Sequence, residues 1–186
     1  MANDPCANKI TDREYLEHMI PHHQVAVDIS YMLQKKTKSV IMHEILRKLI
    51  WTQKYEIELM KHMLDTLPDD MSINSKKMNR KYIPTVADFT KPNESGISDT
   101  YCDPHFFDPE GHMKHMENMK LDDDMYIKHM IPHHQVAVDM SKKLLKHTKN
   151  DFMIFLCYRI IRSQQEEIIQ LQNLLNNNLY KSELIN

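Results

Sequence analysis

Eleven consecutive residues of this chain occur twice without a change. The segment His-Met-Ile-Pro-His-His-Gln-Val-Ala-Val-Asp occupies positions 18–28 and again positions 129–139. An exact repeat of this length indicates a tandem duplication with an offset of 111 residues, and such a repeat dictates the architecture of the chain. The repeated block is also the part richest in imidazole and thioether side chains. Fold and chemistry therefore have to be read from the same residues.

Each copy is predicted to be a helical hairpin, because apolar residues recur at helical spacing on both sides of the block. Thr11-Asp-Arg-Glu14 is a capping box that predicts a helix start near residue 12. Ser39, Asp122 and Asp151 are expected to open the other three helices. The four helices are expected over about residues 12–36, 40–64, 123–147 and 152–179.

The connection between the hairpins has a different composition. Five of the eight prolines and both glycines lie between residues 68 and 111, which predicts a long irregular segment with a short helix near 112–119. The predicted fold class is all-α: a ferritin-like four-helix bundle made of two repeated helical hairpins joined by a long irregular crossover connection. We expect a single domain over 1–186, with hairpins at 12–66 and 122–180 and the connection at 67–121. The relative direction of the two hairpins is left open.

Bulk properties exclude several classes of protein. The formal net charge is −2, so no basic surface for nucleic acid is expected. No stretch approaches the roughly 20 apolar residues of a membrane span, and the first residues do not resemble a secretory signal. We therefore expect a soluble protein without a membrane or nucleic-acid partner, intracellular or in a virion rather than secreted. Its Asn-, Lys- and Ile-rich composition suits an AT-rich genome, such as that of a large virus. Whether the chain forms a homo-oligomer is left open.

The repeated block has the spacing of a metal site. Side chains four residues apart lie on the same helix face, so each block presents two adjacent ligand pairs. Pro21 and Pro132 lie inside these blocks and are expected to kink the helix between the members of each set. The candidate metal ligands are His18, Met19, His22, His23, His129, Met130, His133 and His134.

Imidazole with thioether is a donor set that suits copper, with zinc and iron as alternatives. No Glu-x-x-His sequence occurs, which argues against a ferritin-type di-iron centre. Gln53 and Gln164 are polar residues on apolar stripes, and we expect them to orient the histidine rings from outside the ligand set. Candidates for additional metal ligands are Met140, Cys102, His105, His112 and His115.

The block His-Met-Ile-Pro-His-His-Gln, followed by a second helix reading Gln-x-x-Glu-Ile, resembles domain-of-unknown-function family 305. That pattern is present as Gln53-Lys-Tyr-Glu56-Ile57 and as Gln164-Gln-Glu-Glu167-Ile168. The resemblance covers both hairpins and leaves the connection unexplained. It implies a ferritin-like fold of two similar two-helix repeats and a functional role for the adjacent histidines of each block. The chain departs from the pattern in its long connection, in the absence of an export signal, and in Ile29, where the second repeat has the typical Met140.

Three functions are consistent with these observations. The leading hypothesis is a metal-binding bundle, most simply for copper, that sequesters or delivers the ion. The first alternative is a structural or interaction protein whose core histidines only form hydrogen bonds. The second alternative is a redox enzyme with copper or iron, although paired carboxylates and an activated nucleophile are both missing from the sequence, and no catalytic residue is assigned.

Overall fold

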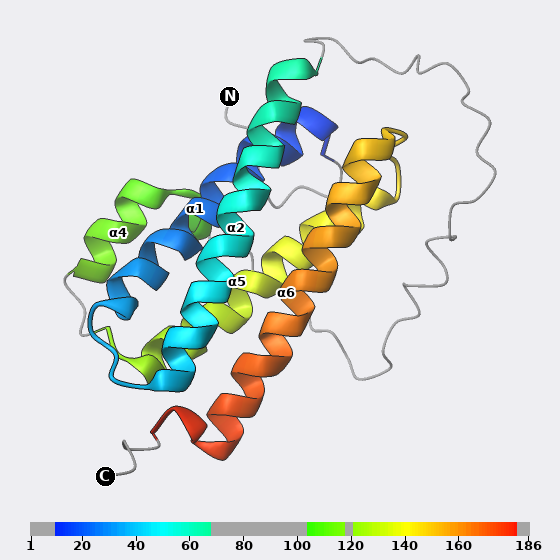
Figure 1. The fold of residues 1–186 in the computed structure, drawn as a ribbon. Coiled ribbons are helices and arrows are strands. Elements are labelled where there is room, and N and C mark those ends of the chain that lie inside the picture. Colours follow the sequence, from blue (N-terminus) through cyan, green and yellow to red (C-terminus); the bar gives the residue numbers. More distant parts are fainter. Residues whose placement is uncertain (1–9, 68–103, 118–120, 182–186) are drawn as a thin grey trace.

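The computed structural model describes residues 10–67, 104–117 and 121–181, and in these ranges the chain is helical with no strand. Four long helices form the bundle, and two short elements from the connection lie against α1 (Figure 1). The four bundle helices are α1 (Asp12–Gln34), α2 (Val40–Thr66), α5 (Asp123–Leu145) and α6 (Asp151–Asn177). The short elements are η1 (Pro104–Phe107) and α4 (Pro109–Glu117), and a final turn, η2 (Leu179–Lys181), follows α6. The all-α prediction and the two helical hairpins are confirmed.

Side-chain caps set the helix starts. The Thr11 hydroxyl accepts from the Glu14 backbone amide, and the Glu14 carboxylate accepts from the Thr11 amide at 2.7 Å, which completes the predicted capping box. Ser39 and Asp122 cap α2 and α5 as expected. The cap of α6 is Asn150 rather than Asp151, because the Asn150 amide oxygen accepts from the backbone amides of Phe152 and Met153.

Neither proline of the repeated blocks ends its helix. Helix α1 runs through Pro21 and α5 runs through Pro132, although proline removes one backbone donor in each. The short helix expected near residues 112–119 is present as α4, which begins at Pro109, and the connection also contributes the 3-10 turn η1.

Two reciprocal contacts between α1 and α5 establish how the hairpins face each other. The Tyr15 hydroxyl lies 2.6 Å from Ser141 Oγ, and the Tyr126 hydroxyl lies 2.7 Å from Ser30 Oγ. The two tyrosines are separated by the repeat offset of 111 residues, and so are the two serines. An early residue of each helix thus meets a late residue of the other, so α1 and α5 are antiparallel and related by an approximate two-fold axis.

The direction of the hydrogen bonds in these contacts follows from the serines. Ser30 donates to the Ala26 carbonyl at 2.6 Å, and Ser141 donates to the Ala137 carbonyl at 2.7 Å. The serine oxygen is therefore the acceptor for the phenol. Burial raises the pKa of both tyrosines, so each hydroxyl keeps the proton that it donates.

The apolar core has two parts. One cluster contains Leu16, Met19 and Cys157, and the other contains Ile29, Met130 and Leu171. Because the two clusters take opposite halves of each hairpin, the middle of the bundle is left to polar side chains.

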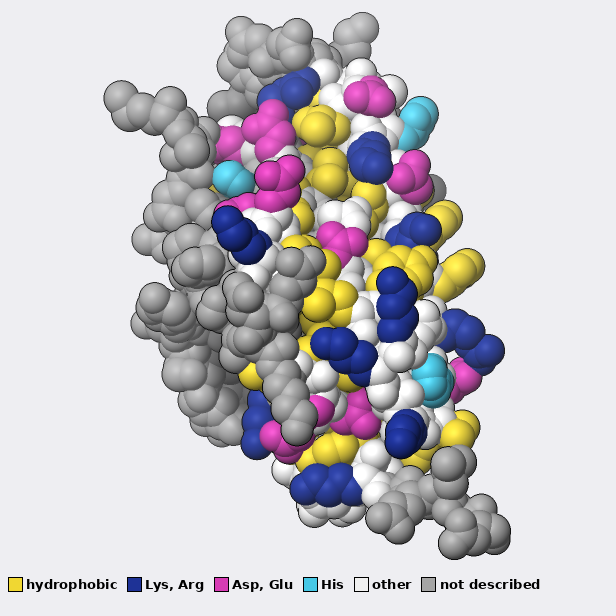
Figure 2. Space-filling model, turned by 90° about the vertical axis from the view of Figure 1, so that its left-hand side faces the viewer, with side chains coloured by type: hydrophobic (Ala, Val, Ile, Leu, Met, Phe, Trp, Pro, Cys, Tyr) yellow, Lys and Arg dark blue, Asp and Glu magenta, His cyan; other side chains and the backbone are white. Residues whose placement is uncertain are grey.

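Surface properties agree with the nearly balanced charge. On the face shown in Figure 2, Lys and Arg side chains are interspersed with Asp and Glu. Among the described helices, none combines the length and the apolar character needed to cross a bilayer.

Candidate metal centre

A polar layer crosses the bundle at the level where α1 meets α5. Every side chain in this layer is at most 2 % exposed. The layer consists of His22 and His23 from α1, His133 and His134 from α5, Gln53 and Glu56 from α2, and Gln164 and Glu167 from α6. The duplication thus brings both histidine sets into one place, which the sequence left undecided.

His22 and His133 lie face to face at the centre of this layer. Their ring centroids are 3.7 Å apart and their planes are inclined by 30°. Burial lowers the pKa of both imidazoles well below the ordinary value of 6.5, and the neighbouring histidines lower it further. Both rings are therefore neutral near pH 7, which is the form that binds a metal ion.

The ring nitrogens of this central pair are buried without hydrogen bonds to the described residues. Neither Nδ1 nor Nε2 of His22 or His133 has such a partner. A buried polar group without a partner costs roughly 1–3 kcal/mol, so it needs an explanation in the chemistry of the site. A metal ion that accepts the lone pairs of these nitrogens would explain why they are buried without hydrogen bonds.

Two carboxyl groups face the outer histidines of the layer. His23 Nε2 is hydrogen-bonded to Glu56 Oε2 at 2.9 Å. His134 Nε2 lies 2.9 Å from Glu167 Oε2, at a hydrogen-bond distance but without the in-line geometry. When a carboxylate accepts the Nε2 proton, Nδ1 carries the lone pair, so the Glu56 contact favours Nδ1 of His23 as the nitrogen that would bind a metal ion. The Glu167 carboxylate lies close enough to do the same for His134.

The two carboxylates are not equivalent. Glu56 Oε1 also lies 3.3 Å from Arg159 Nε and accepts from the Ser163 hydroxyl at 3.2 Å. Neither oxygen of Glu167 has a hydrogen bond to the described residues. The two repeats are thus similar in backbone but differ in the polar partners of their carboxylates.

The glutamines do not make the expected contacts. Gln53 and Gln164 are buried as predicted, but their amide groups form no hydrogen bond with an imidazole or with any other described group. The orienting contacts come from Glu56 and Glu167, which were missed. Their signal was present in the sequence, because Gln-x-x-Glu places a carboxylate on the same helix face nearly one turn later.

The remaining predicted ligands lie around the layer rather than in it. Met19 and Met130 are fully buried, but in different halves of the apolar core, and Met140 belongs to the same half as Met19. His18 and His129 are partly exposed at its edge. The structure therefore buries four of the six histidines in the layer, keeps His18 and His129 at its edge, and leaves the methionines to the core.

Residues from the connection cover one side of the layer. Phe106 packs against His133, with ring centroids 4.9 Å apart, and Phe107 packs against His22 at 5.1 Å. His112 of α4 lies against His129 at 4.9 Å. This covering was not predicted, because the connection has no counterpart in the repeat. Cys102 and the side chains of His105 and His115 lie outside the described part of the structure.

The layer supplies suitable donors but no preformed coordination shell. Among the described residues, no three His, Cys, Asp or Glu side chains converge as metal ligands. A metal ion binds in the plane of an imidazole ring, and two stacked rings cannot both point at one ion. The chemistry of the donors fits a metal ion, and the geometry requires His22 and His133 to rotate when one binds.

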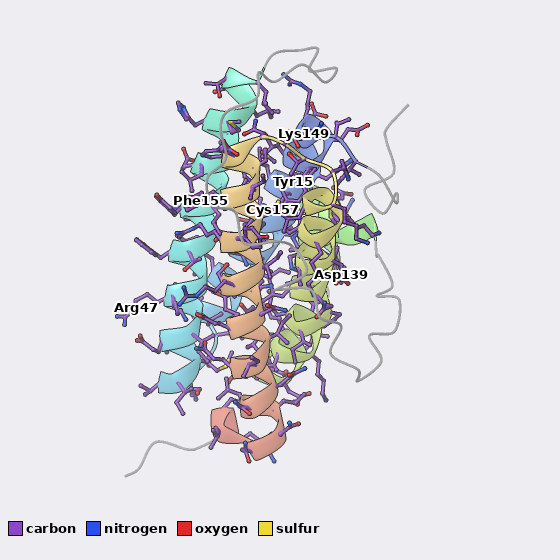
Figure 3. All side chains as sticks on the ribbon, turned by 90° about the vertical axis from the view of Figure 1, so that its right-hand side faces the viewer. Tyr15, Arg47, Asp139, Lys149, Phe155 and Cys157 are labelled. Carbon is purple, nitrogen blue, oxygen red and sulfur yellow. The ribbon has the colours of Figure 1, made fainter. Side chains whose placement is uncertain are left out.

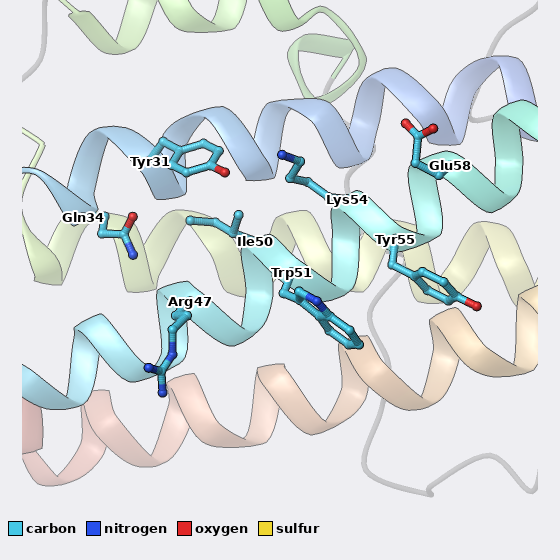
Figure 4. A pocket seen from close by; sticks show the side chains of 8 residues that line it. All are labelled: Tyr31, Gln34, Arg47, Ile50, Trp51, Lys54, Tyr55 and Glu58. Carbon is cyan, nitrogen blue, oxygen red and sulfur yellow. The ribbon is translucent and has the colours of Figure 1, made fainter.

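Two other features do not extend this site. The Cys157 thiol packs beside the Tyr15 hydroxyl (Figure 3), and burial raises its pKa to about 12, so it is not a thiolate near pH 7. A shallow surface pocket between α1 and α2 (Figure 4) is lined by no histidine. Its wall includes the stacked rings of Trp51 and Tyr55, which are 69 % and 47 % exposed.

Solved structures of known proteins share the fold of this chain. CopM in its Cu(I)-bound form is 27 % identical, with a TM-score of 0.63, over 91 % of this chain and 98 % of CopM. CopM has also been solved in Cu(II)- and silver-bound forms. A DUF305 protein from Streptomyces coelicolor shares the fold, with 20 % identity and a TM-score of 0.60 over 90 % of this chain and 93 % of that one.

Relatives in sequence include the uncharacterized protein L153 of Acanthamoeba polyphaga mimivirus. The two are 41 % identical over 56 residues, which is 30 % of this chain and 37 % of the viral protein. The match thus spans little more than a third of that relative. The family model for the domain of unknown function DUF305 matches residues 12–175, which span both hairpins, and the chain belongs to this family.

Proposed function

We propose that this protein binds copper in the polar layer between α1 and α5 and serves to sequester or deliver the ion. One observation carries the proposal: His22 and His133 meet at the centre of the bundle as fully buried, neutral imidazoles without hydrogen bonds to the described residues. His23 and His134 complete a set of four imidazoles from the two repeats.

The donor set favours copper over harder ions. Imidazole nitrogens suit Cu(I) and Cu(II), whereas magnesium or calcium would require oxygen ligands. Glu56 and Glu167 add carboxyl groups at 0 % and 2 % exposure, and their negative charge would offset the charge of a bound cation. The copper- and silver-bound forms of CopM support the same choice of ion.

Storage or delivery fits the layer better than turnover. Helix α4 and η1 cover one side of the layer, and Phe106 and Phe107 pack directly on the central rings. Two surface pockets lined by residues of α1 and α2 do not reach these histidines. A bound ion would be enclosed by protein groups, which suits retention rather than reaction with a substrate.

A competition titration tests this proposal. The purified full-length protein is titrated anaerobically with Cu(I) against a chromophoric chelator, beside the double variant His22→Phe/His133→Phe. Phenylalanine keeps an aromatic ring in each position and removes only the nitrogen donors. We expect the variant to lose at least a hundredfold in affinity for the tightest copper ion.

The control removes the same number of imidazoles from elsewhere. His43 and His62 are exposed on α2, and His43→Gln/His62→Gln should bind copper as the unmodified protein does. An unchanged stoichiometry and affinity in the His22→Phe/His133→Phe variant would refute the proposal.

A further inference from the structure

The connection breaks the two-fold symmetry of the histidines at one edge of the polar layer. His18 and His129 are repeat mates, both partly exposed. His129 lies against the His112 ring of α4, with centroids 4.9 Å apart and planes inclined by 40°. His18 instead faces Phe107, at 6.2 Å. Among the described side chains, two imidazoles thus lie side by side at the edge in the second repeat and not in the first.

The separation of these two rings matches that of imidazoles that share one ion. Metal–nitrogen bonds of about 2 Å and a tetrahedral angle would place the two ring centroids about 5 Å apart. His112 and His129 are already at this separation, whereas the central pair, at 3.7 Å, is stacked too closely. The edge pair therefore needs less rearrangement to hold an ion than the central pair does.

A soft donor accompanies the pair in the second repeat only. Met125 lies one turn before His129 on α5, on the same helix face, and is partly buried. The corresponding residue of the first repeat is Glu14, whose carboxylate is used in the capping box of α1. Two imidazoles and a thioether are the donor set of a soft monovalent cation.

We propose that His112 and His129, with the thioether of Met125, form an outer binding site for a soft monovalent cation such as Cu(I). The site lies on the way to the polar layer, since His129 is partly exposed and its ring centroid is 6.0 Å from that of His133. An ion held there can pass inward to the buried imidazoles. The role as a path to the layer rests on the proposed function, but the outer site itself does not.

Silver(I) is the probe for the test, because it is redox-inert and leaves the imidazole NMR signals observable. The full-length protein is titrated with Ag(I) while the ring signals of the histidines are followed. In the unmodified protein, we expect the His112 and His129 signals to shift together during the titration. In His112→Phe, one equivalent of Ag(I) should be lost and the shift of the His129 signals should disappear, while the signals of His22 and His133 still respond.

Phenylalanine is a matched replacement for His112, because Phe107 already packs an aromatic ring against His18 at the equivalent place in the first repeat. Two further variants make the result independent of whether α4 stays folded. Met125→Leu keeps the volume of the side chain and leaves α4 untouched, and we expect it to weaken the outer site by about tenfold. Glu110→Gln, exposed on α4, should bind as the unmodified protein does.

The outcomes separate the outer site from the proposed function. If His112→Phe and Met125→Leu bind Ag(I) with unchanged stoichiometry and affinity, the outer site is refuted, whatever the polar layer does. If His22→Phe/His133→Phe still binds one equivalent that shifts His129, the outer site stands although the polar layer is disabled. If the unmodified protein binds no Ag(I), both proposals fail.

Discussion

The metal-free protein should lose stability in mild acid because of its central histidine pair. His22 and His133 are fully buried, and burial lowers the pKa of each below the value of about 6.5 expected in the unfolded chain. Below pH 6.5 the unfolded chain therefore binds more protons than the folded one, and falling pH favours unfolding. The stability due to the neutral pair is complete above this pH and is lost as the pH falls toward the folded pKa values.

The magnitude follows from the number of protons taken up. Between pH 7.5 and pH 5.5, one imidazole that titrates near 6.5 only when unfolded lowers the free energy of unfolding by about 1.4 kcal/mol. The pair should therefore remove at most about 2.7 kcal/mol, which corresponds to a fall in Tm of up to roughly 5–10 °C for a chain of this size. This upper limit is reached when neither buried ring binds a proton in the folded state.

Urea unfolding with a chelator present, at both pH values, measures this loss. The His22→Phe/His133→Phe variant should lose less than the unmodified protein, by up to about 2.7 kcal/mol, and each single variant by up to about 1.4 kcal/mol. Comparing losses cancels the contributions of all other titrating groups. The control His43→Gln/His62→Gln should keep the loss of the unmodified protein. An equal loss in the His22→Phe/His133→Phe variant would refute the view that the central imidazoles are neutral because they are buried.

Three further outcomes are expected. Tyr15→Phe and Tyr126→Phe should each cost about 1 kcal/mol in urea unfolding, and about 2 kcal/mol together, because the reciprocal hydrogen bonds lie at separate ends of the α1–α5 contact; a strongly unequal pair would contradict the two-fold relation. Glu56→Gln and Glu167→Gln should each lower copper affinity in the chelator competition by about 10–100-fold, because each carboxylate selects the imidazole nitrogen that binds; unchanged affinity in both would exclude this role. Arg159→Leu should destabilise the fold by roughly 1–3 kcal/mol in urea, because the buried Glu56 loses its cationic partner; a neutral effect would show that this contact is dispensable.

The repeat in the sequence predicted most of the bundle. An exact copy at a fixed offset requires two equivalent hairpins, and the caps at Thr11, Ser39 and Asp122 mark their helix starts because each satisfies a free backbone amide locally. Helical spacing also placed His22 near the centre of the buried face of α1. The caps and the helical spacing depend on residues within a few turns of one another, and the repeat is visible by inspection, so a single sequence displays all three directly.

Features that depend on distant parts of the chain could not be predicted in this way. The contact between Tyr15 and Ser141 joins residues 126 positions apart, and with its counterpart between Tyr126 and Ser30 it shows that α1 and α5 are antiparallel. Phe106 and His112 come from a segment without a repeat, so no periodicity indicated that they pack on the histidines.

The difference between the expected and the observed partners of the histidine rings has another cause. A glutamine and a glutamate three positions apart share a helix face, and helical spacing does not tell which of the two reaches the imidazole. In the structure, Glu56 and Glu167 reach the histidine rings and the glutamines do not. Met19 and Met130 were likewise candidates because they are next to the histidine motif, but their side chains fill the apolar core on either side of it.

The position of the bound ion is the most direct test of the polar layer as a metal centre. Crystals of the full-length protein loaded with Cu(I) would be measured at wavelengths on both sides of the copper absorption edge. We predict an anomalous peak in the layer between α1 and α5, with the His22 and His133 rings rotated out of their stack. A fully loaded crystal with copper only outside the bundle, and with these two rings still stacked, would contradict the proposed function.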